Sequence, residues 1–160
     1  MQFSENSRVW VYQANKKLSD SEVNQIQSEL DSFAAAWTAH NHQLKAKGEV
    51  RYNSFIILTV DESQAGASGC SIDKSVRFIQ QLEQQNDITL LDRFNLAYRE
   101  GSEVHSAPRQ AFEELLKQGA INSRTIVFNN MVQNLADLHT KWEVPFKDSW
   151  HMQLFGELVK

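Results

Sequence analysis

The segment from Phe55 to Leu82 constrains the fold more than any other part of the chain. It opens with FIILTV, an unbroken β-forming run that is apolar on both alternating faces, as in a central strand covered on both sides. A loop rich in glycine and serine follows, and then a helical apolar stripe of Ile72, Val76, Ile79 and Leu82. Strand, glycine-rich loop and helix N-terminus in this order form a common anion-binding arrangement. The segment therefore predicts both the centre of a sheet and a candidate binding loop.

The first third of the chain predicts a strand followed by a long amphipathic helix. Residues 8–13 carry apolar side chains on both faces, so we expect this strand to lie inside the sheet. A capping box beginning at Ser19 opens a helix that continues to Trp37 with apolar residues three or four positions apart. With the strand at residues 55–60, this helix makes a βαβ unit, for which we expect a right-handed parallel crossover. The stretch up to Gly48 reads as an irregular connection.

The second half of the chain predicts a hairpin and three further elements. Apolar residues alternate from Phe94 onwards, and a turn near Gly101 indicates an antiparallel hairpin. The further elements are a helix from Pro108 capped by Ser106, a strand at residues 125–128 and a helix at residues 132–142. The segment from Trp150 to Phe155 is too apolar to lie free in solvent, so we expect it to pack on the domain.

Length and composition fit one globular domain spanning residues 1–160. The chain is long enough to bury a core without disulfides, and its apolar fraction of 41% and charged fraction of 22% are ordinary. Together with the order of the elements, this predicts an α/β (α+β) fold in which helices pack on a mixed β-sheet.

Charge and cysteine content exclude several classes of protein. A net charge of −4 with scattered basic residues argues against binding to nucleic acid. No apolar run reaches the roughly 20 residues of a membrane span, and the N-terminal residues lack the pattern of a signal peptide. Cys70 is the only cysteine, which rules out an internal disulfide and favours a reducing compartment. We therefore expect a cytoplasmic protein without a membrane span.

The loop from Asp61 to Ser75 is the candidate binding site. Free amides at a helix N-terminus can hold a small anion, and hydroxyl groups and a lysine nearby add to this. The residues expected to do so are Gly66, Ser68, Gly69, Ser71, Lys74 and Ser75. Gly69 and Lys74 also approach the phosphate-binding loop of nucleotide hydrolases, but Asp73 occupies the position of its second glycine.

Cys70 is a second candidate, as the nucleophile of a cysteine-dependent enzyme. A helix N-terminus favours the thiolate form of a cysteine. The competing interpretation, which we favour, is a small buried side chain, because no cationic partner must face the sulfur. Asp61 or Glu62, of which only one can face the loop, could hold a divalent cation together with Asp73, yet no complete metal-ligand motif is present and no cofactor is identified.

Four segments carry a family resemblance: WVYQANKKLSDSEV, FAAAWTAHNHQLKA, VDESQAGASGCSIDKSVRFIQQLE and KWEVPFKDSWHMQLF. They resemble a family of uncharacterised small bacterial proteins, and the resemblance covers nearly the whole chain. Members often carry the label "ABC transporter ATPase", and the resemblance implies a cytoplasmic protein without an established activity. The residues do not support the label, because such an ATPase needs a complete phosphate-binding loop in a much longer chain.

Three functions remain open from the sequence. The leading one is a binding or accessory protein that takes a small anionic ligand or a protein partner through the loop from Asp61 to Ser75. The alternatives are a cysteine-dependent enzyme that uses Cys70 and a nucleotide hydrolase.

Overall fold

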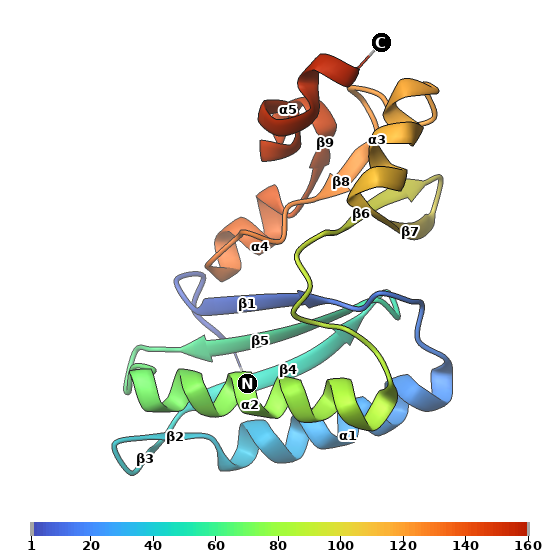
Figure 1. Ribbon diagram of the computed structural model, residues 1–160. Helices are drawn as coiled ribbons and strands as arrows, with labels where there is room; N and C mark the ends of the chain where they lie inside the picture. The colour runs from blue at the N-terminus through green and yellow to red at the C-terminus, as the bar shows by residue number, and fades with distance from the viewer. Residues whose placement is uncertain (1, 160) are drawn as a thin grey trace.

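Two antiparallel sheets, one from each half of the chain, form the framework of the molecule (Figure 1). The structure is a computed structural model, and it describes residues 2–159. The first sheet has the strand order β1 (Arg8–Gln13), β5 (Phe55–Asp61) and β4 (Lys45–Arg51). The second has the order β7 (Glu103–Pro108), β6 (Asn95–Glu100), β8 (Ile126–Phe128) and β9 (Glu143–Pro145). The expected α/β (α+β) class is confirmed.

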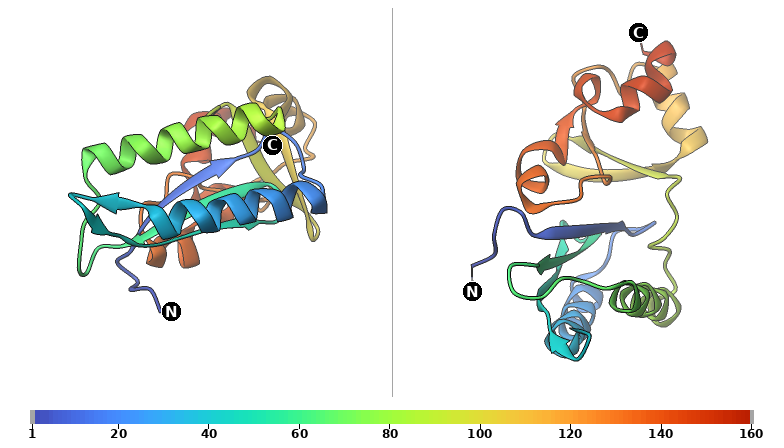
Figure 2. Two further views of the ribbon diagram at one scale, coloured as in Figure 1. Left: turned by 90° about the horizontal axis from the view of Figure 1, so that it is seen from below. Right: turned by 90° about the vertical axis from the view of Figure 1, so that its left-hand side faces the viewer.

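Two long helices, α1 (Asp20–Ala36) and α2 (Gly69–Asn86), cover the same face of the first sheet (Figure 2). The expected capping box of α1 is confirmed, because the Ser19 hydroxyl accepts from the N–H of Glu22 while the Glu22 carboxylate accepts from the N–H of Ser19. Between α1 and β4, the short strands β2 (Thr38–Ala39) and β3 (His42–Gln43) form a small hairpin.

The parallel crossover expected for the first βαβ unit is wrong. β1 pairs with β5 in the antiparallel direction, with Val9 opposite Thr59. The sequence pattern missed β4, which receives the chain from α1 and returns it to β5 through a tight hairpin. β1 and β4 run in the same direction but lie on opposite sides of β5, so no neighbouring strands in residues 2–159 are parallel. The expected mixed sheet is therefore replaced by antiparallel sheets.

β4 escapes a pattern search because its sequence, KAKGEVR, is polar and has a glycine at its centre. Packing explains the glycine: a Cβ at position 48 would lie 2.9 Å from Cδ2 of Leu30 on α1. The Gln27 side chain on α1 also donates to the carbonyl oxygen of Gly48 at 2.8 Å and accepts from the N–H of Val50 at 3.0 Å. Contacts with α1 and β5 thus define this strand.

β5 is the expected central strand, and every one of its seven residues is buried. β1, which was expected inside the sheet, is instead at its edge. Both faces of β1 are still covered, because Trp10 and Tyr12 pack against the helices while Val9 and Val11 pack against the second half of the chain. Apolar residues on both faces of a strand indicate that both faces are covered by other elements. They do not indicate whether the strand lies at the centre or at the edge of the sheet.

The second half confirms the expected hairpin, with Gly101 at φ 62° in the turn between β6 and β7. Its helices are α3 (Arg109–Lys117), α4 (Leu135–Lys141) and α5 (Trp150–Phe155), with short 3-10 turns at Phe146–Asp148 and Gly156–Leu158. The expected Ser106 cap is wrong, because Ser106 lies within β7 and α3 follows Pro108 directly. The expected packing of the C-terminal segment is confirmed, since Phe155 is buried with its ring centroid 5.3 Å from that of Phe112.

One hydrophobic cluster joins the two halves. Phe55 and Ile57 of the first sheet pack there with Phe128 and Trp142 of the second half. The ring of Phe55 lies 4.8 Å from that of Phe128 and 4.9 Å from that of Trp142, measured between centroids. Within residues 2–159, the structure contains no helix with the length and apolar character needed to span a membrane.

Candidate functional site

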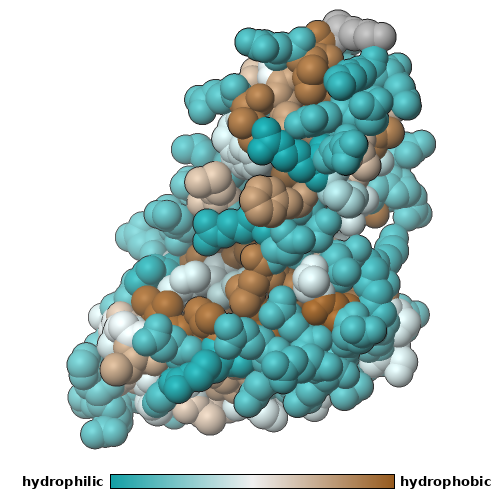
Figure 3. All heavy atoms as spheres, viewed as in Figure 1, coloured by the Kyte–Doolittle hydropathy of each residue, from teal (hydrophilic) through white to brown (hydrophobic). Residues whose placement is uncertain are grey.

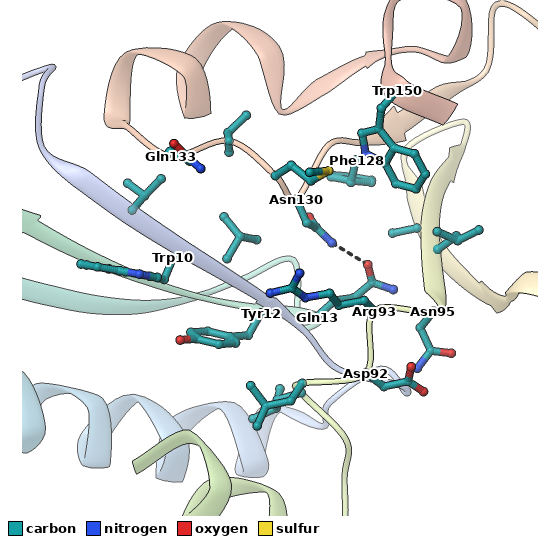
Figure 4. Close-up of a pocket in the computed structure, with 18 of the residues that line it drawn as sticks. Trp10, Tyr12, Gln13, Asp92, Arg93, Asn95, Phe128, Asn130, Gln133 and Trp150 are labelled. Atoms are coloured by element: carbon teal, nitrogen blue, oxygen red, sulfur yellow. Dashed lines mark hydrogen bonds between the residues drawn. The ribbon is translucent and has the colours of Figure 1, made fainter. Parts of the chain in front are cut away.

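A pocket of about 740 Å³ opens between the two sheets, beside the outer edge of β1 (Figure 4). Its volume is in the range of sites that hold small organic molecules, roughly 300–1,000 Å³. The walls come from β1, the segment that leads into β6, and the loop that follows β8, with Val76 of α2 and Trp150 of α5 completing them. In the space-filling view, hydrophobic residues form a band just below the waist of the molecule, among hydrophilic ones (Figure 3).

The outer edge of β1 is paired at both of its ends. At the start, the N–H of Val9 donates to the carbonyl oxygen of Gln133 at 3.0 Å. Just beyond the end, the N–H of Asn15 donates to the carbonyl oxygen of Thr89 at 3.2 Å. The chain itself therefore closes this edge above and below the pocket.

Between those ends the edge is open. Backbone groups of successive strand residues point in opposite directions, and Ala14 donates on the β5 side, to Ser54. The N–H and C=O groups of Val11 and Gln13 consequently point outward, and both residues line the pocket. In the part of the chain that the structure describes, no hydrogen bond joins these outward groups to another residue. A strand edge in this state presents donors and acceptors to whatever enters the pocket.

A chain of side-chain hydrogen bonds fixes the orientation of a buried amide at the pocket wall. The indole N–H of Trp142 donates to Oδ1 of Asn130 at 2.9 Å, and Nδ2 of Asn130 donates to Oε1 of Gln13 at 2.9 Å (dashed line in Figure 4). Because an indole can only donate, the polarity of the whole chain is set. The NH₂ group of Gln13 is left over, and it has no partner among the described residues although Gln13 is only 4% exposed. A buried donor without a partner costs about 1–3 kcal/mol.

The pocket also has an unpaired cation. Arg93 forms no ion pair or hydrogen bond with any other residue between 2 and 159, whereas Arg8 is 3.8 Å from the carboxylate of Glu62. Burial raises the pKa of Tyr12, and Ser75 and, to a smaller extent, the charge of Arg93 act against that rise. Asp92 is the carboxylate on the pocket wall. The balance of charge at the wall is therefore positive.

The mouth of the pocket carries exposed apolar side chains. Leu91 and Met131 line the pocket and are 37% and 69% exposed. Exposed apolar residues at a pocket often contribute to an interaction site. These two extend the apolar wall to the surface.

The predicted binding loop lies elsewhere, at the N-terminus of α2. The structure brings Ser68 and Ser71 together as a capping box, with the N–H of Ser71 donating to the Ser68 hydroxyl at 3.1 Å. Ser75 is fully buried, and its hydroxyl donates to the carbonyl oxygen of Ile72. Gly66, Gly69 and Lys74 are exposed. The serine hydroxyl groups of this segment thus form hydrogen bonds with the backbone of α2 and its N-terminal cap.

Carboxylates already occupy the space around that loop. The Glu62 carboxylate accepts from the N–H of Ala67 at 2.8 Å, so a negative charge lies where an anion was expected. Asp61 accepts from the Ser63 hydroxyl, from the backbone of Ser4 and Ser63, and from Lys45, and these bonds, led by that of the hydroxyl, hold its pKa well below the usual range. Asp61 therefore fastens the N-terminal segment to the end of β5. Residues 2–159 contain no group of three or more His, Cys, Asp or Glu side chains that could hold a metal ion.

Cys70 is exposed on the first turn of α2, so the favoured interpretation of a buried cysteine is wrong. The glycine before it is already the first residue of the helix, and the loop ahead of the helix is too open to seal the sulfur. The start of α2 at Gly69 also argues against the nucleotide-hydrolase hypothesis. A phosphate-binding loop wraps between its first glycine and its lysine, but here Gly69 and Lys74 belong to one continuous helix.

The pocket residues were missed by sequence reasoning. Two signals pointed to them: a polar Gln13 that ends an apolar strand, and an asparagine pair that directly follows the strand ending at Phe128. Neither signal shows that the two amides meet, because Gln13 and Asn130 are 117 positions apart in the chain.

Comparison with known proteins identifies no relative: no protein-family model matches the chain, and neither a curated protein nor a solved structure does. The resemblance to small bacterial proteins gains no support from these comparisons. Inferences about function therefore rest on the geometry of the pocket.

Proposed function

We propose that this protein binds a small organic anion with a flat apolar body in the pocket beside β1. The observation that carries the proposal is a pocket whose wall combines aromatic side chains, an open strand edge and Arg93, a cation without an ion-pair partner among the described residues. Apolar walls with a few polar groups that converge on the pocket are the usual form of a small-molecule site.

The walls match such a ligand in shape and charge. Trp10, Phe128 and Trp150 supply aromatic surfaces against which a flat ring can pack. Arg93 supplies a planar cation suited to a carboxylate or phosphate group. The small anionic ligand expected from the sequence is retained in this proposal, but its site moves from the loop before α2 to the pocket.

The composition of the walls favours binding over nucleophilic catalysis. The lining residues include no cysteine, histidine, serine, threonine or lysine among those the structure describes, and Tyr12 and Asp92 are the titratable groups beside the two arginines. Cys70 and His151 both lie outside this lining. Most wall residues are apolar side chains or uncharged amides, which orient a ligand without reacting with it.

Binding of 2-naphthoate, compared with 2-naphthamide, tests the proposal. We expect ¹⁵N-resolved NMR titration to shift the amides of Val11, Gln13 and Asn130, with the anion binding more tightly than the amide. Replacing Arg93 with Gln should weaken naphthoate binding by about tenfold, the usual size of one charge-assisted hydrogen bond. Arg77→Gln is the matched control, because Arg77 is exposed on α2 and lies outside the lining.

A second pair of variants tests the location. Val76→Phe places a larger side chain in the pocket and should abolish binding, whereas Val23→Phe makes the same change at a half-buried position of α1 and should preserve it. Naphthoate binding that survives both Arg93→Gln and Val76→Phe would contradict the proposal.

A further inference from the structure

We infer that the open edge of β1 recognises the N–H and C=O of a lactam-like edge on a planar heterocycle, an inference that rests on the proposed function and specifies its ligand. The recognition groups are the outward N–H and C=O of Val11 and the NH₂ of Gln13.

The backbone geometry supplies the first two contacts. Val11 points its N–H and its C=O out of the same edge, as alternate residues of an antiparallel strand do. A ring that carries an N–H next to a C=O can donate to the Val11 carbonyl oxygen and accept from the Val11 N–H at once. Ligands with only acceptors or only donors satisfy half of this pair.

The amide chain supplies the third contact and gives it a direction. Trp142 donates to Asn130, and Asn130 in turn donates to Gln13, so the group that Gln13 leaves unpaired is a donor, covered behind the pocket wall. A second acceptor on the ligand, such as a ring nitrogen or a second carbonyl, meets this donor when the Gln13 side chain turns towards the pocket. The pattern read along the edge from Val11 towards Gln13 is therefore donor, acceptor and donor on the protein.

The length of the open edge favours a ring over a peptide strand. Val9 and Asn15 are bonded to Gln133 and Thr89, so the open stretch runs only from Val11 to Gln13. At about 3.4 Å per residue this stretch is roughly 10 Å long, shorter than the five or six residues of an ordinary strand. A longer peptide would have to displace the segments that close the edge.

Apolar surfaces lie on both sides of the plane in which such a ring would sit. Phe128 and Val132 belong to the hydrophobic cluster on one face of the first sheet, and Leu90 belongs to the cluster on the other face. All three line the pocket. A flat ring that extends the sheet from its edge would thus be enclosed from above and below.

Three bicyclic probes of nearly equal shape test the inference: isoquinolin-1(2H)-one, its N-methyl derivative, and naphthalene. In ¹⁵N NMR titrations of the full chain, we expect the lactam to bind at least tenfold more tightly than either of the others, with the largest shift at the Val11 amide. Gln13→Met keeps the length of the side chain and removes its donor. It should therefore weaken the binding of quinazolin-4(3H)-one, which has the second acceptor, more than the binding of isoquinolin-1(2H)-one.

The outcomes separate this inference from the proposed function. Equal affinity of the lactam and its N-methyl derivative in the pocket would overturn the inference and leave the pocket as a binding site. Binding of naphthoate without any binding of the lactam would do the same. A capped trialanine peptide that binds more tightly than the lactam would overturn it in favour of an added peptide strand, and failure of naphthoate and all probes would overturn both.

Discussion

Replacing Gly48 with alanine should destabilise the protein, although glycine is ordinarily a poor residue in the middle of a strand. The new Cβ would lie 2.9 Å from Cδ2 of Leu30 and 3.2 Å from Cδ2 of Leu58, closer than the optimum of about 3.5–4.0 Å between carbon atoms. Both leucines are fully buried, so neither can turn out into solvent. Overpacking of this kind costs roughly 1–3 kcal/mol, and the lower entropy of the unfolded alanine chain offsets about 0.4–1 kcal/mol. We expect the free energy of unfolding to fall by about 1–2 kcal/mol.

Urea unfolding followed by circular dichroism measures this change, and a second background isolates its cause. Leu30→Ala alone should cost about 2–5 kcal/mol and leave room beside position 48. In that background Gly48→Ala should cost less, because the 2.9 Å contact with Cδ2 of Leu30 is removed while the contacts with Cβ of residue 30 at 3.1 Å and Cδ2 of Leu58 at 3.2 Å remain. Gly69→Ala is the control, since nothing lies within 4 Å of a Cβ there. The reasoning is refuted if Gly48→Ala is as harmless as Gly69→Ala, or if it costs the same in both backgrounds.

Three further predictions concern the titration of His151, the reactivity of Cys70 and the binding of Mg-ATP. His151 is fully buried, and burial lowers its pKa to about 4, so the neutral form stabilises the fold. The contribution of His151 to the free energy of unfolding should be fully present above the unfolded pKa of about 6.5. The free energy of unfolding should fall by about 3 kcal/mol as the pH drops towards 4. Urea midpoints across this range should show a shallower slope for His151→Gln, and equal slopes would contradict the assignment. Cys70 is exposed, so iodoacetamide should alkylate native protein about as fast as unfolded protein; strong protection in the native state would mean that the thiol is sealed. Because Gly69 and Lys74 lie in one helix, calorimetry should detect no micromolar binding of Mg-ATP, and such binding, if lost in Lys74→Ala, would restore the hydrolase hypothesis.

The elements that could be predicted from the sequence are those with local causes. The helix after Ser19 has its own capping box and apolar stripe, and the run beginning at Phe55 is apolar at almost every position. β4 has no such signal, because it depends on contacts that Gln27 and Leu30 make from a different element. The direction of strand pairing was wrong for the same reason: leaving out β4 placed α1 directly before β5.

The candidate site could not be predicted because its parts come together only in the folded chain. Gln13, Arg93 and Asn130 belong to three separate segments, and no local pattern shows that these segments meet. The glycine and serine cluster before Ile72 gave a stronger local signal, but its hydroxyl groups cap α2 and Ser75 is buried. Local sequence patterns identify helix starts well. Whether a strand edge stays open depends instead on whether another segment of the folded chain pairs with it.

Hydrogen exchange of the β1 amides tests most directly whether the open strand edge is a ligand site. Trp10 and Tyr12 face β5 and should exchange slowly, whereas Val11 and Gln13 face the pocket and should exchange orders of magnitude faster. Saturation with isoquinolin-1(2H)-one should slow the exchange of the Val11 amide selectively. If Val11 is as protected as Trp10 in the free protein, or if bound lactam leaves its exchange unchanged, the edge is not the site.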